Sequence, residues 1–260
     1  MTDWWYKMTQ VINIMAEACD TLKLSGVLLG YQSIADECAK QELSYTDYLN
    51  RLLSYELEHR AQKGRSVVLK MAGFPTMKTL EMFDFKESSI NKSQITELST
   101  LRFMTNAENI IMLGSSGIGK THLAISLGYL ATQQRYKVRF FTAADLLLQL
   151  EVANKQNRLE QYLSKVVAGS RLLIIDEFGY VKLNEVQANL FFQVVNKRYE
   201  TGAIIITSNL IFTKWKEVLN NDEALTAAIL DRLIHHSHII NIQGDSYRLK
   251  QKRKAGIIPV

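Results

Sequence analysis

Two short stretches of this chain combine residue types that handle phosphate chemistry. The first is a glycine-rich loop, Gly114 to Gly119, followed at once by Lys120 and Thr121. Its glycines allow backbone conformations in which several N–H groups point at one anion, and the helix after it adds the positive end of its dipole. Lysine at this position reaches the β- and γ-phosphates of a nucleotide, and the threonine hydroxyl suits Mg²⁺. The residues expected to contact the nucleotide are Gly114, Ser115, Ser116, Gly117, Ile118, Gly119, Lys120, Thr121 and His122.

The second stretch is a pair of carboxylates, Asp176 and Glu177, directly after the apolar run Leu172 to Ile175. We expect Asp176 and Thr121 to hold Mg²⁺, with Asp176 acting through the water shell of the ion. Glu177 is placed to polarise an attacking water as a general base. A strand that ends in Asp-Glu is common by itself. After a phosphate loop, with room for one intervening strand, the pair favours an ATPase over a nucleotide kinase or a GTPase.

Two further polar residues are candidates for catalysis. Asn209 follows the apolar run Ala203 to Thr207 and can hydrogen-bond the attacking water or the γ-phosphate; the alternative is a residue that caps the strand. Arg232 lies in a predicted helix over 227–236, placed like an arginine finger that a neighbouring subunit of a homo-oligomer supplies. The alternative for Arg232 is an ion pair with Asp231 or another surface group.

The elements around these residues alternate between short apolar runs and amphipathic stretches. This alternation predicts an α/β fold, with a parallel five-stranded sheet covered by helices on both faces. Few residues follow Arg232, so we expect no C-terminal lid domain. The five predicted strands are 110–113, 138–142, 172–175, 203–207 and 239–242.

The N-terminal part shows helical spacing and no convincing strand. Ser44 and Asp47 predict a capping box that starts a helix, and Pro75 should end the helical pattern. We therefore predict a helical domain over 1–70, a linker over 71–85, an ATPase domain over 86–250 and a basic tail over 251–260.

The composition, 47% hydrophobic and 22% charged, is that of an ordinary soluble globular protein with a sizeable core. The two cysteines, Cys19 and Cys38, suggest neither a disulfide framework nor a zinc site. The N-terminus does not resemble a secretory signal, and no apolar run is long enough to span a membrane. We therefore expect a cytoplasmic protein with no membrane partner.

The net charge of +5 favours polyanionic partners without proving one. Lys155, Arg158 and Lys165 lie in a polar stretch, 149–168, between the predicted second and third strands, where they are candidates for contact with DNA phosphates. An ordinary solvated helix is the alternative. A second basic run, Arg248 to Lys254, is either a phosphate-binding tail or a solvated one.

Together these residues resemble the IstB family, the ATP-binding helpers of IstA/IstB-type insertion sequences. The resemblance covers nearly the whole chain, and it is carried by Tyr45 to Arg65, Met71 to Pro75, Lys78 to Phe85, Arg139 to Leu147, Asp176 to Tyr180, Thr207 to Asn209, Ile229 to Leu233 and Gly244 to Lys250.

The resemblance implies an AAA+ ATPase that uses ATP and Mg²⁺. Such proteins assemble as homo-oligomers on duplex DNA without strong sequence preference, deform the DNA, and recruit and stimulate the partner transposase IstA. ATP hydrolysis then controls disassembly and target selection. A basic surface supplies affinity for DNA of any sequence, and the contacts made by many assembled subunits offset the few kcal/mol that bending the DNA costs.

Two other functions remain open from the sequence. A replicative-helicase loader of the DnaC type has the same ATPase core, but its partner is a helicase and its nucleic acid is single-stranded. The N-terminal part fits the IstB pattern better. A structural clamp with negligible turnover is the other alternative, and Glu177 and Arg232 both argue against it.

Overall fold

A computed structural model describes residues 13–244, 246 and 247 of the chain. The chain divides into two compact units, Met1–Val67 and Val68–Val260. The predicted basic tail over 251–260 and the basic run that begins at Arg248 lie outside the described residues.

The first unit is helical, as its sequence predicts. It contains helical residues 13–21, α2 (Ser25–Lys40) and most of α3 (Tyr45–Ala72). The predicted capping box is confirmed, because the Ser44 hydroxyl accepts from the Asp47 N–H and the Asp47 carboxylate accepts from the Ser44 N–H, both at 3.2 Å. The buried carboxylate of Glu56 on α3 accepts from the N–H of Val27 at 2.8 Å, so one helix caps the start of the other.

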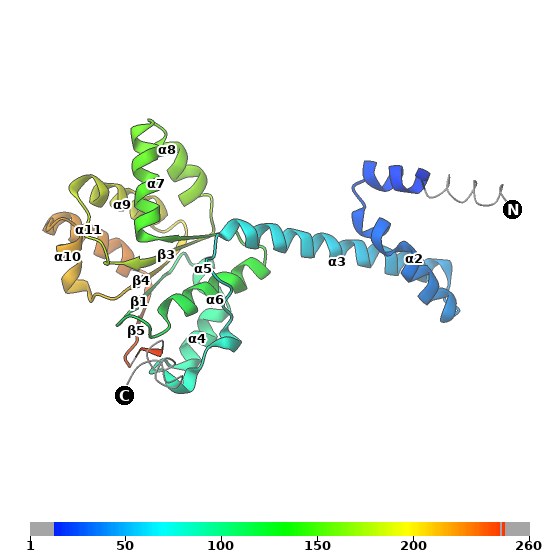
Figure 1. The fold of residues 1–260 in the computed structure, drawn as a ribbon, viewed down its shortest axis with the longest axis horizontal. Helices are drawn as coiled ribbons and strands as arrows, with labels where there is room; N and C mark the ends of the chain where they lie inside the picture. The colour runs from blue at the N-terminus through cyan, green and yellow to red at the C-terminus, as the bar shows by residue number, and fades with distance from the viewer. Residues whose placement is uncertain (1–12, 245, 248–260) are drawn as a thin grey trace, which may run out of the picture. The chain divides into compact units, whose positions relative to one another are not determined.

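The second unit contains the predicted sheet (Figure 1). Its strands are β1 (Asn109–Leu113), β2 (Val138–Thr142), β3 (Leu172–Phe178), β4 (Ala203–Ser208) and β5 (Ser237–Asn241). Its α-helices are α4 (Lys92–Ser99), α5 (Arg102–Thr105), α6 (Lys120–Gln133), α7 (Ala143–Lys155), α8 (Leu159–Tyr162), α9 (Glu185–Arg198), α10 (Trp215–Val218) and α11 (Glu223–Ile234). Short 3-10 turns occur at η1 (Leu80–Met82), η2 (Phe85–Glu87) and η4 (Phe212–Lys214), and η3 (Leu163–Val167) is a π-helix.

All neighbouring strands are parallel, in the order β2-β3-β4-β1-β5, which confirms the predicted α/β sheet. The central strands β1 and β4 are buried along their whole length, as expected for a sheet covered on both faces. Because every strand runs the same way, the carboxyl ends of all five meet at one edge, where open α/β sheets bind their ligands. None of the helices in the described residues has the length and apolar character needed to cross a bilayer.

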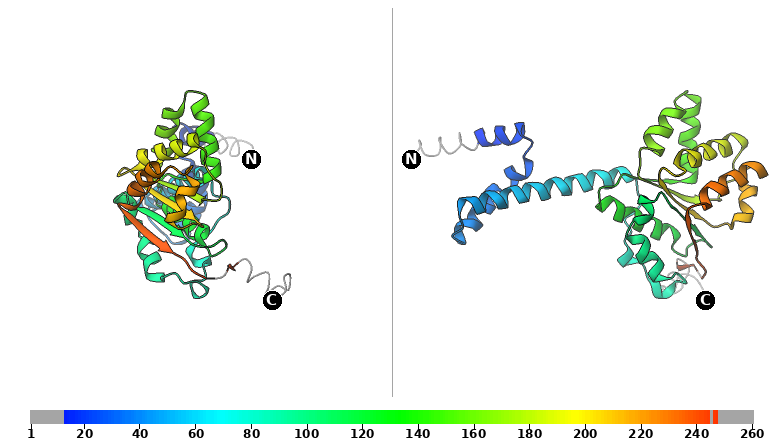
Figure 2. Two further views of the ribbon diagram at one scale, coloured as in Figure 1. Left: turned by 90° about the vertical axis from the view of Figure 1, so that its left-hand side faces the viewer. Right: turned by 180° about the vertical axis from the view of Figure 1, so that it is seen from behind.

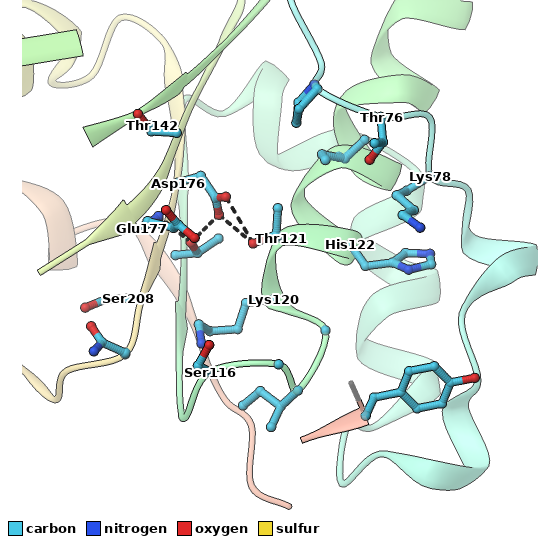
Figure 3. Close-up of a pocket in the computed structure, with 18 of the residues that line it drawn as sticks. Thr76, Lys78, Ser116, Lys120, Thr121, His122, Thr142, Asp176, Glu177 and Ser208 are labelled. Atoms are coloured by element: carbon cyan, nitrogen blue, oxygen red, sulfur yellow. Dashed lines mark hydrogen bonds between the residues drawn. The ribbon is translucent and has the colours of Figure 1, made fainter. Parts of the chain in front are cut away.

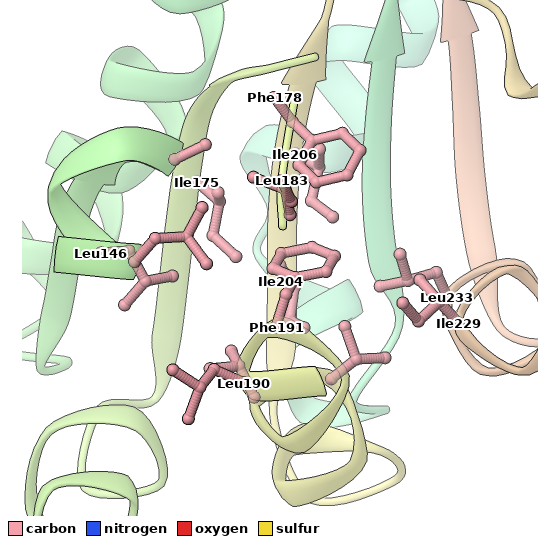
Figure 4. Close-up of a cluster of buried hydrophobic side chains, with 14 of the residues drawn as sticks. Leu146, Ile175, Phe178, Leu183, Leu190, Phe191, Ile204, Ile206, Ile229 and Leu233 are labelled. Carbon is pink, nitrogen blue, oxygen red and sulfur yellow. The ribbon is translucent and has the colours of Figure 1, made fainter. Parts of the chain in front are cut away.

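Alternate residues along the strands fill two separate apolar layers. On β3, Leu173 and Ile175 pack with α7, α9 and α11, whereas Leu172 and Ile174 pack with α4, α5 and α6. Figures 1 and 2 show the helices on the two sides of the sheet, and Figure 4 shows the first layer around Phe178 and Phe191. Because side chains alternate between the two faces of each strand, one set of apolar residues packs against α6 and holds it, with the loop before it, on the sheet.

The stretch 71–85, for which the sequence predicts a linker, lies within the second unit and packs on its core. Helix α3 ends at Ala72, before Pro75 as expected, and Gly73 turns the chain with φ 74°. Phe74, Leu80, Phe83 and Phe85 are partly buried against the layer that contains α6. Aromatic side chains in this stretch have enough apolar area to hold it on the domain, which a flexible linker lacks.

A buried arginine joins three segments on the far side of the sheet from α6. The guanidinium of Arg198, the last residue of α9, donates to the carbonyls of Val167 and Ser170, at 2.8 and 2.5 Å, and of Arg171 and Ala203, at 3.0 and 2.5 Å. Burial lowers the pKa of Arg198 to about 10, which still leaves it charged at neutral pH. These bonds fix the end of η3 and the turn into β3 against the start of β4.

We expect the substitution Arg198→Met to lower the free energy of unfolding by about 3 kcal/mol or more, because several buried carbonyls lose their donors at once. Urea denaturation followed by circular dichroism would measure it. The neighbouring Lys197→Met is the control: its ion pair with Glu160 is largely exposed, so the midpoint should hardly move. Equal midpoints for the two variants would contradict the stabilising role of Arg198.

Candidate nucleotide-binding site

The glycine-rich loop lies between β1 and α6, as its sequence predicts. Gly114, Gly117 and Gly119 have φ of 142°, 81° and 103°, a region that favours glycine. Helix α6 starts at Lys120, and no side chain caps its N-terminus. The first N–H groups of α6 therefore face the loop with the positive end of the helix dipole behind them.

The ammonium group of Lys120 is held inside this loop. Its Nζ donates to the carbonyls of Gly114 and Ser115, at 2.6 and 2.7 Å, and the residue is only 7% exposed. The loop thus surrounds a buried cation with backbone groups. An anion that enters the loop meets this cation and the start of α6 together.

The carboxylate of Asp176 receives two hydroxyl groups from other elements. Thr121 Oγ1, at the start of α6, lies 2.8 and 3.0 Å from the two Asp176 oxygens. Thr207 Oγ1, on β4, donates to Asp176 Oδ1 at 2.5 Å. Figure 3 shows the contacts between Thr121 and Asp176. The structure therefore brings together the two predicted metal-site residues, Thr121 and Asp176.

The next residue, Glu177, has an unusual backbone. Its φ is 61°, a left-handed conformation that costs a side-chain-bearing residue about 1–3 kcal/mol. It sits where the register of β3 against β4 shifts, between Ile175 and Phe178. Unlike its neighbours in β3, Glu177 is exposed, and it lines the same cleft as Lys120 and Thr121. Figure 3 shows its side chain beside that of Asp176.

The predicted sensor Asn209 lines this cleft just after β4. Its side-chain oxygen Oδ1 is buried and makes no hydrogen bond to the described part of the chain. An orphaned buried acceptor in a cleft is costly unless a ligand or water donates to it. The position therefore suits a hydrogen bond with a bound group.

The cleft has a volume of about 890 Å³ and includes residues that the sequence left unassigned. One wall is the stretch predicted as a linker: Phe83 packs edge-on against His122, and the ring of His122 meets the Thr79 carbonyl through Nε2 at 2.9 Å. Burial lowers the pKa of His122 below that of a free imidazole. A Cβ on Gly119 would come within 2.5 Å of the Phe83 ring, so this wall touches the loop itself. The sequence signals for this wall were the family resemblance over Lys78 to Phe85 and the two phenylalanines within it.

Another wall of the cleft comes from the chain after β5. Tyr247 donates its backbone N–H to the carbonyl of Gly117 at 2.9 Å, and its side chain lines the cleft. Side chains at Gly117 and Gly114 would collide with Ser246 Oγ and the Ile242 carbonyl, both at 2.2 Å. Close packing against backbone therefore favours glycine at Gly114 as strongly as its φ does, whereas at Gly117 the Ser246 side chain could turn away and φ is the main reason.

Arg232 does not line the cleft of its own chain. It lies on α11, where its guanidinium carbon is 5.0 Å from the centre of the Phe192 ring and its Nε donates to Asn196 Oδ1 at 3.2 Å. The predicted DNA residues are also away from the cleft. Lys155 ends α7, Arg158 precedes α8 and Lys165 lies in η3, and all three side chains are exposed.

Comparisons with known proteins identify the family of this chain. The family described as IstB-like ATP binding protein matches residues 17–255. The insertion sequence IS21 putative ATP-binding protein of Pseudomonas aeruginosa is 44% identical over 91% of this chain and 89% of its own length. The corresponding IS5376 protein of Geobacillus stearothermophilus is 42% identical over 91% of this chain and 94% of its own length.

Solved structures support the fold. AMPPCP-bound DnaA from Aquifex aeolicus aligns with a TM-score of 0.52 at 23% identity, covering 70% of this chain and 56% of that one. The crystal structure of DnaI aligns with a TM-score of 0.52 at 17% identity, covering 68% of this chain and 94% of that one. The second unit thus has the P-loop AAA+ fold that its sequence predicts. From the extent of the family match and the identity of these relatives, the chain belongs to the IstB-like ATP-binding protein family.

Proposed function

We propose that this protein binds ATP with Mg²⁺ in the cleft around Lys120, hydrolyses it, and uses the cycle to assemble on duplex DNA and recruit a partner transposase. The observation that carries the nucleotide proposal is the loop itself, which holds a buried lysine ammonium and leads into a helix whose N-terminus has no side-chain cap. The relatives named as ATP-binding proteins support the choice of ATP.

The donor set at the end of β3 fits Mg²⁺. The ion prefers oxygen ligands and keeps several waters, and a hydroxyl and a carboxylate, Thr121 and Asp176, lie together at the cleft beside the phosphate loop. These two residues would hold the ion, and it would supply charge neutralisation on the transferred phosphoryl group. A hydroxyl and a carboxylate are hard oxygen donors, which suit Mg²⁺ better than zinc.

Glu177 is the proposed general base, and Asn209 the residue that orients the water or the γ-phosphate. The exposed carboxylate of Glu177 and the unpartnered Oδ1 of Asn209 line the same cleft as Lys120. Arg232 is the proposed arginine finger for a neighbouring subunit, and its position outside its own cleft supports a role in trans. Gly114 to His122 complete the proposed nucleotide contacts.

The DNA proposal rests on charge and on the relatives. Lys155, Arg158 and Lys165 lie on one segment between β2 and β3 and are exposed. Phosphate contacts of this kind give affinity without sequence preference. The relatives are named as proteins of insertion sequences, which supports a partner transposase over a helicase.

We expect Lys120→Ala to weaken ATP binding by roughly a hundredfold, since it removes a charged donor worth about 3 kcal/mol. Equilibrium titration with a fluorescent ATP analogue would measure the change. Lys137→Ala, which removes an exposed lysine that does not line the cleft, is the control. Wild-type affinity in the Lys120 variant would rule out this loop as the phosphate site.

Glu177→Gln should bind ATP normally, and its rate of ATP turnover should fall by about 10²–10⁴-fold, because an amide cannot accept the proton.

Arg232→Ala should also lower the rate of ATP turnover, by about 10³–10⁵-fold. Mixing the two variants should restore part of the phosphate release, because Glu177→Gln subunits still carry Arg232.

The control for this mixture pairs Arg232→Ala with a subunit that carries both substitutions, which has no arginine to lend. Recovery at no mixing ratio would contradict a role for Arg232 in trans.

Replacing Lys155, Arg158 and Lys165 together with alanine should weaken duplex binding and flatten its salt dependence. The log–log slope should fall by about 0.9 for each phosphate that the protein no longer neutralises. Fluorescence anisotropy at several salt concentrations, with ATP present, would measure this. ATP affinity should be unchanged.

The matched control replaces Lys92, Arg102 and Lys137, which are equally exposed and remove the same charge. The same loss of affinity in both triple variants would show that the segment between β2 and β3 has no special part. Tighter binding of single strands than of duplex would favour the helicase-loader function.

A further inference from the structure

The register of β3 and β4 contains an extra residue on β3. Ile175 pairs with Ile206, and the next pair is Phe178 with Ser208. Asp176 and Glu177 are therefore both opposite one residue, Thr207. Such bulges are rare between parallel strands, and they commonly re-aim a side chain next to an active site.

The bulge disturbs the hydrogen bonding of the backbone at Glu177. Its φ of 61° departs from an extended strand, so its N–H does not continue the regular ladder. The hydroxyl of Thr207 accepts this N–H at 3.0 Å. A side chain thus supplies the acceptor that the ladder carbonyl would provide in a regular strand, and it satisfies a backbone donor that would otherwise be left unpaired.

The same hydroxyl acts at once as a donor. Thr207 Oγ1 donates to Asp176 Oδ1 at 2.5 Å, and Thr207 is only 1% exposed. The chain of bonds runs from the Glu177 N–H to the Thr207 hydroxyl and on to the Asp176 carboxylate. Bonds linked in this way polarise and strengthen one another. A β-branched side chain also has few rotamers, which fixes the oxygen in place.

Asp176 has a second hydroxyl donor, Thr121, but the two threonines differ in the other groups that they contact. Thr121 belongs to α6, and its oxygen is the proposed ligand of the cation. Both bonds of Thr207 are to the protein, and both go to adjacent residues of β3. If the Thr121 oxygen turns to the cation, Thr207 is the donor that still orients Asp176.

We infer that Thr207 is a positioning residue for the proposed hydrolysis: one buried hydroxyl sets the metal-side carboxylate of Asp176 and the strained backbone that aims Glu177 into the cleft. This inference rests on the proposed function. Thr207 precedes Asn209 in the chain, and it acts on other residues of the protein, whereas Asn209 is proposed to contact the water or the nucleotide. A hydroxyl is required, because only a group that donates and accepts can serve both neighbours.

The test compares Thr207→Val, Thr207→Ser and Thr132→Val in the full chain. Valine keeps the shape of threonine and removes both bonds, and serine keeps both bonds. Thr132→Val is the matched control, since Thr132 is equally buried and donates only to the Tyr129 carbonyl within its own helix. The measurements are steady-state turnover, the affinity for ATP without Mg²⁺, the Mg²⁺ concentration that half-saturates its effect on ATP affinity, and thermal melting.

Thr207→Val is expected to lower kcat by about 10–100-fold and to raise the Mg²⁺ requirement for nucleotide binding, as loss of an outer partner of a metal ligand does elsewhere. Its ATP affinity without Mg²⁺ should stay near wild type. Thr207→Ser should recover most of both properties. Thr132→Val should lower the melting temperature and leave kcat and the Mg²⁺ requirement unchanged.

If Thr207→Val matches Thr132→Val in kcat and in Mg²⁺ requirement, the inference is wrong. The proposed function then still stands, provided that the wild-type protein hydrolyses ATP. Absence of turnover in the wild-type protein would overturn both. If melting shows that Thr207→Val is unfolded, Thr207→Cys takes its place, because a thiol of similar size is a weaker donor and acceptor. Wild-type kcat and Mg²⁺ requirement in that variant would equally overturn the inference.

Discussion

The carboxylate of Asp176 is the point at which three elements of the second unit meet. It lies at the end of β3, it is only 4% exposed, and it accepts hydroxyl groups from α6 and from β4. A buried carboxylate without donors is strongly unfavourable, so each of these elements must be in place for the others to be stable where they are. Because Thr121 is the second residue of α6, its bond to Asp176 also holds the loop that precedes this helix.

Packing supports the same arrangement from both sides of the sheet. Alternate residues of β3 face different apolar layers, and α6 is held by one of them. Around the loop, Phe83, Ile242 and Ser246 each lie close to one of the glycines and leave little room for a side chain there. The glycine-rich loop is thus confined by two parts of the chain that are far from it in sequence.

The sequence predicts those parts of the site that depend on neighbouring residues. The loop Gly114 to Thr121 and the pair Asp176 and Glu177 each follow a short apolar run, so spacing and apolar runs suffice to find them. The five parallel strands follow from the same alternation. Strand ends were less well predicted: β5 begins at Ser237 rather than Ile239, and β3 extends to Phe178.

Contacts between residues far apart in the chain had no such signal. The stretch 71–85 read as a linker because Pro75 stops a helix, and nothing local shows that Phe83 reaches Gly119. The bulge at Glu177 depends on the register between two strands, which the sequence does not encode locally. Thr207 accordingly read as an ordinary strand residue, although its hydroxyl joins both carboxylate positions.

The strand order has a consequence for folding during synthesis on the ribosome. β1 lies between β4 and β5, pairing Ile111 with Ile206 on one side and with Ile239 on the other, so both of its neighbours emerge long after it does. Contacts of such separation form slowly because a long loop must close first. The glycine loop behind β1 also needs Ile242 and Tyr247. A nascent chain therefore completes its glycine-rich loop only after β5 has emerged, whereas the helices of the first unit can form while translation is still under way.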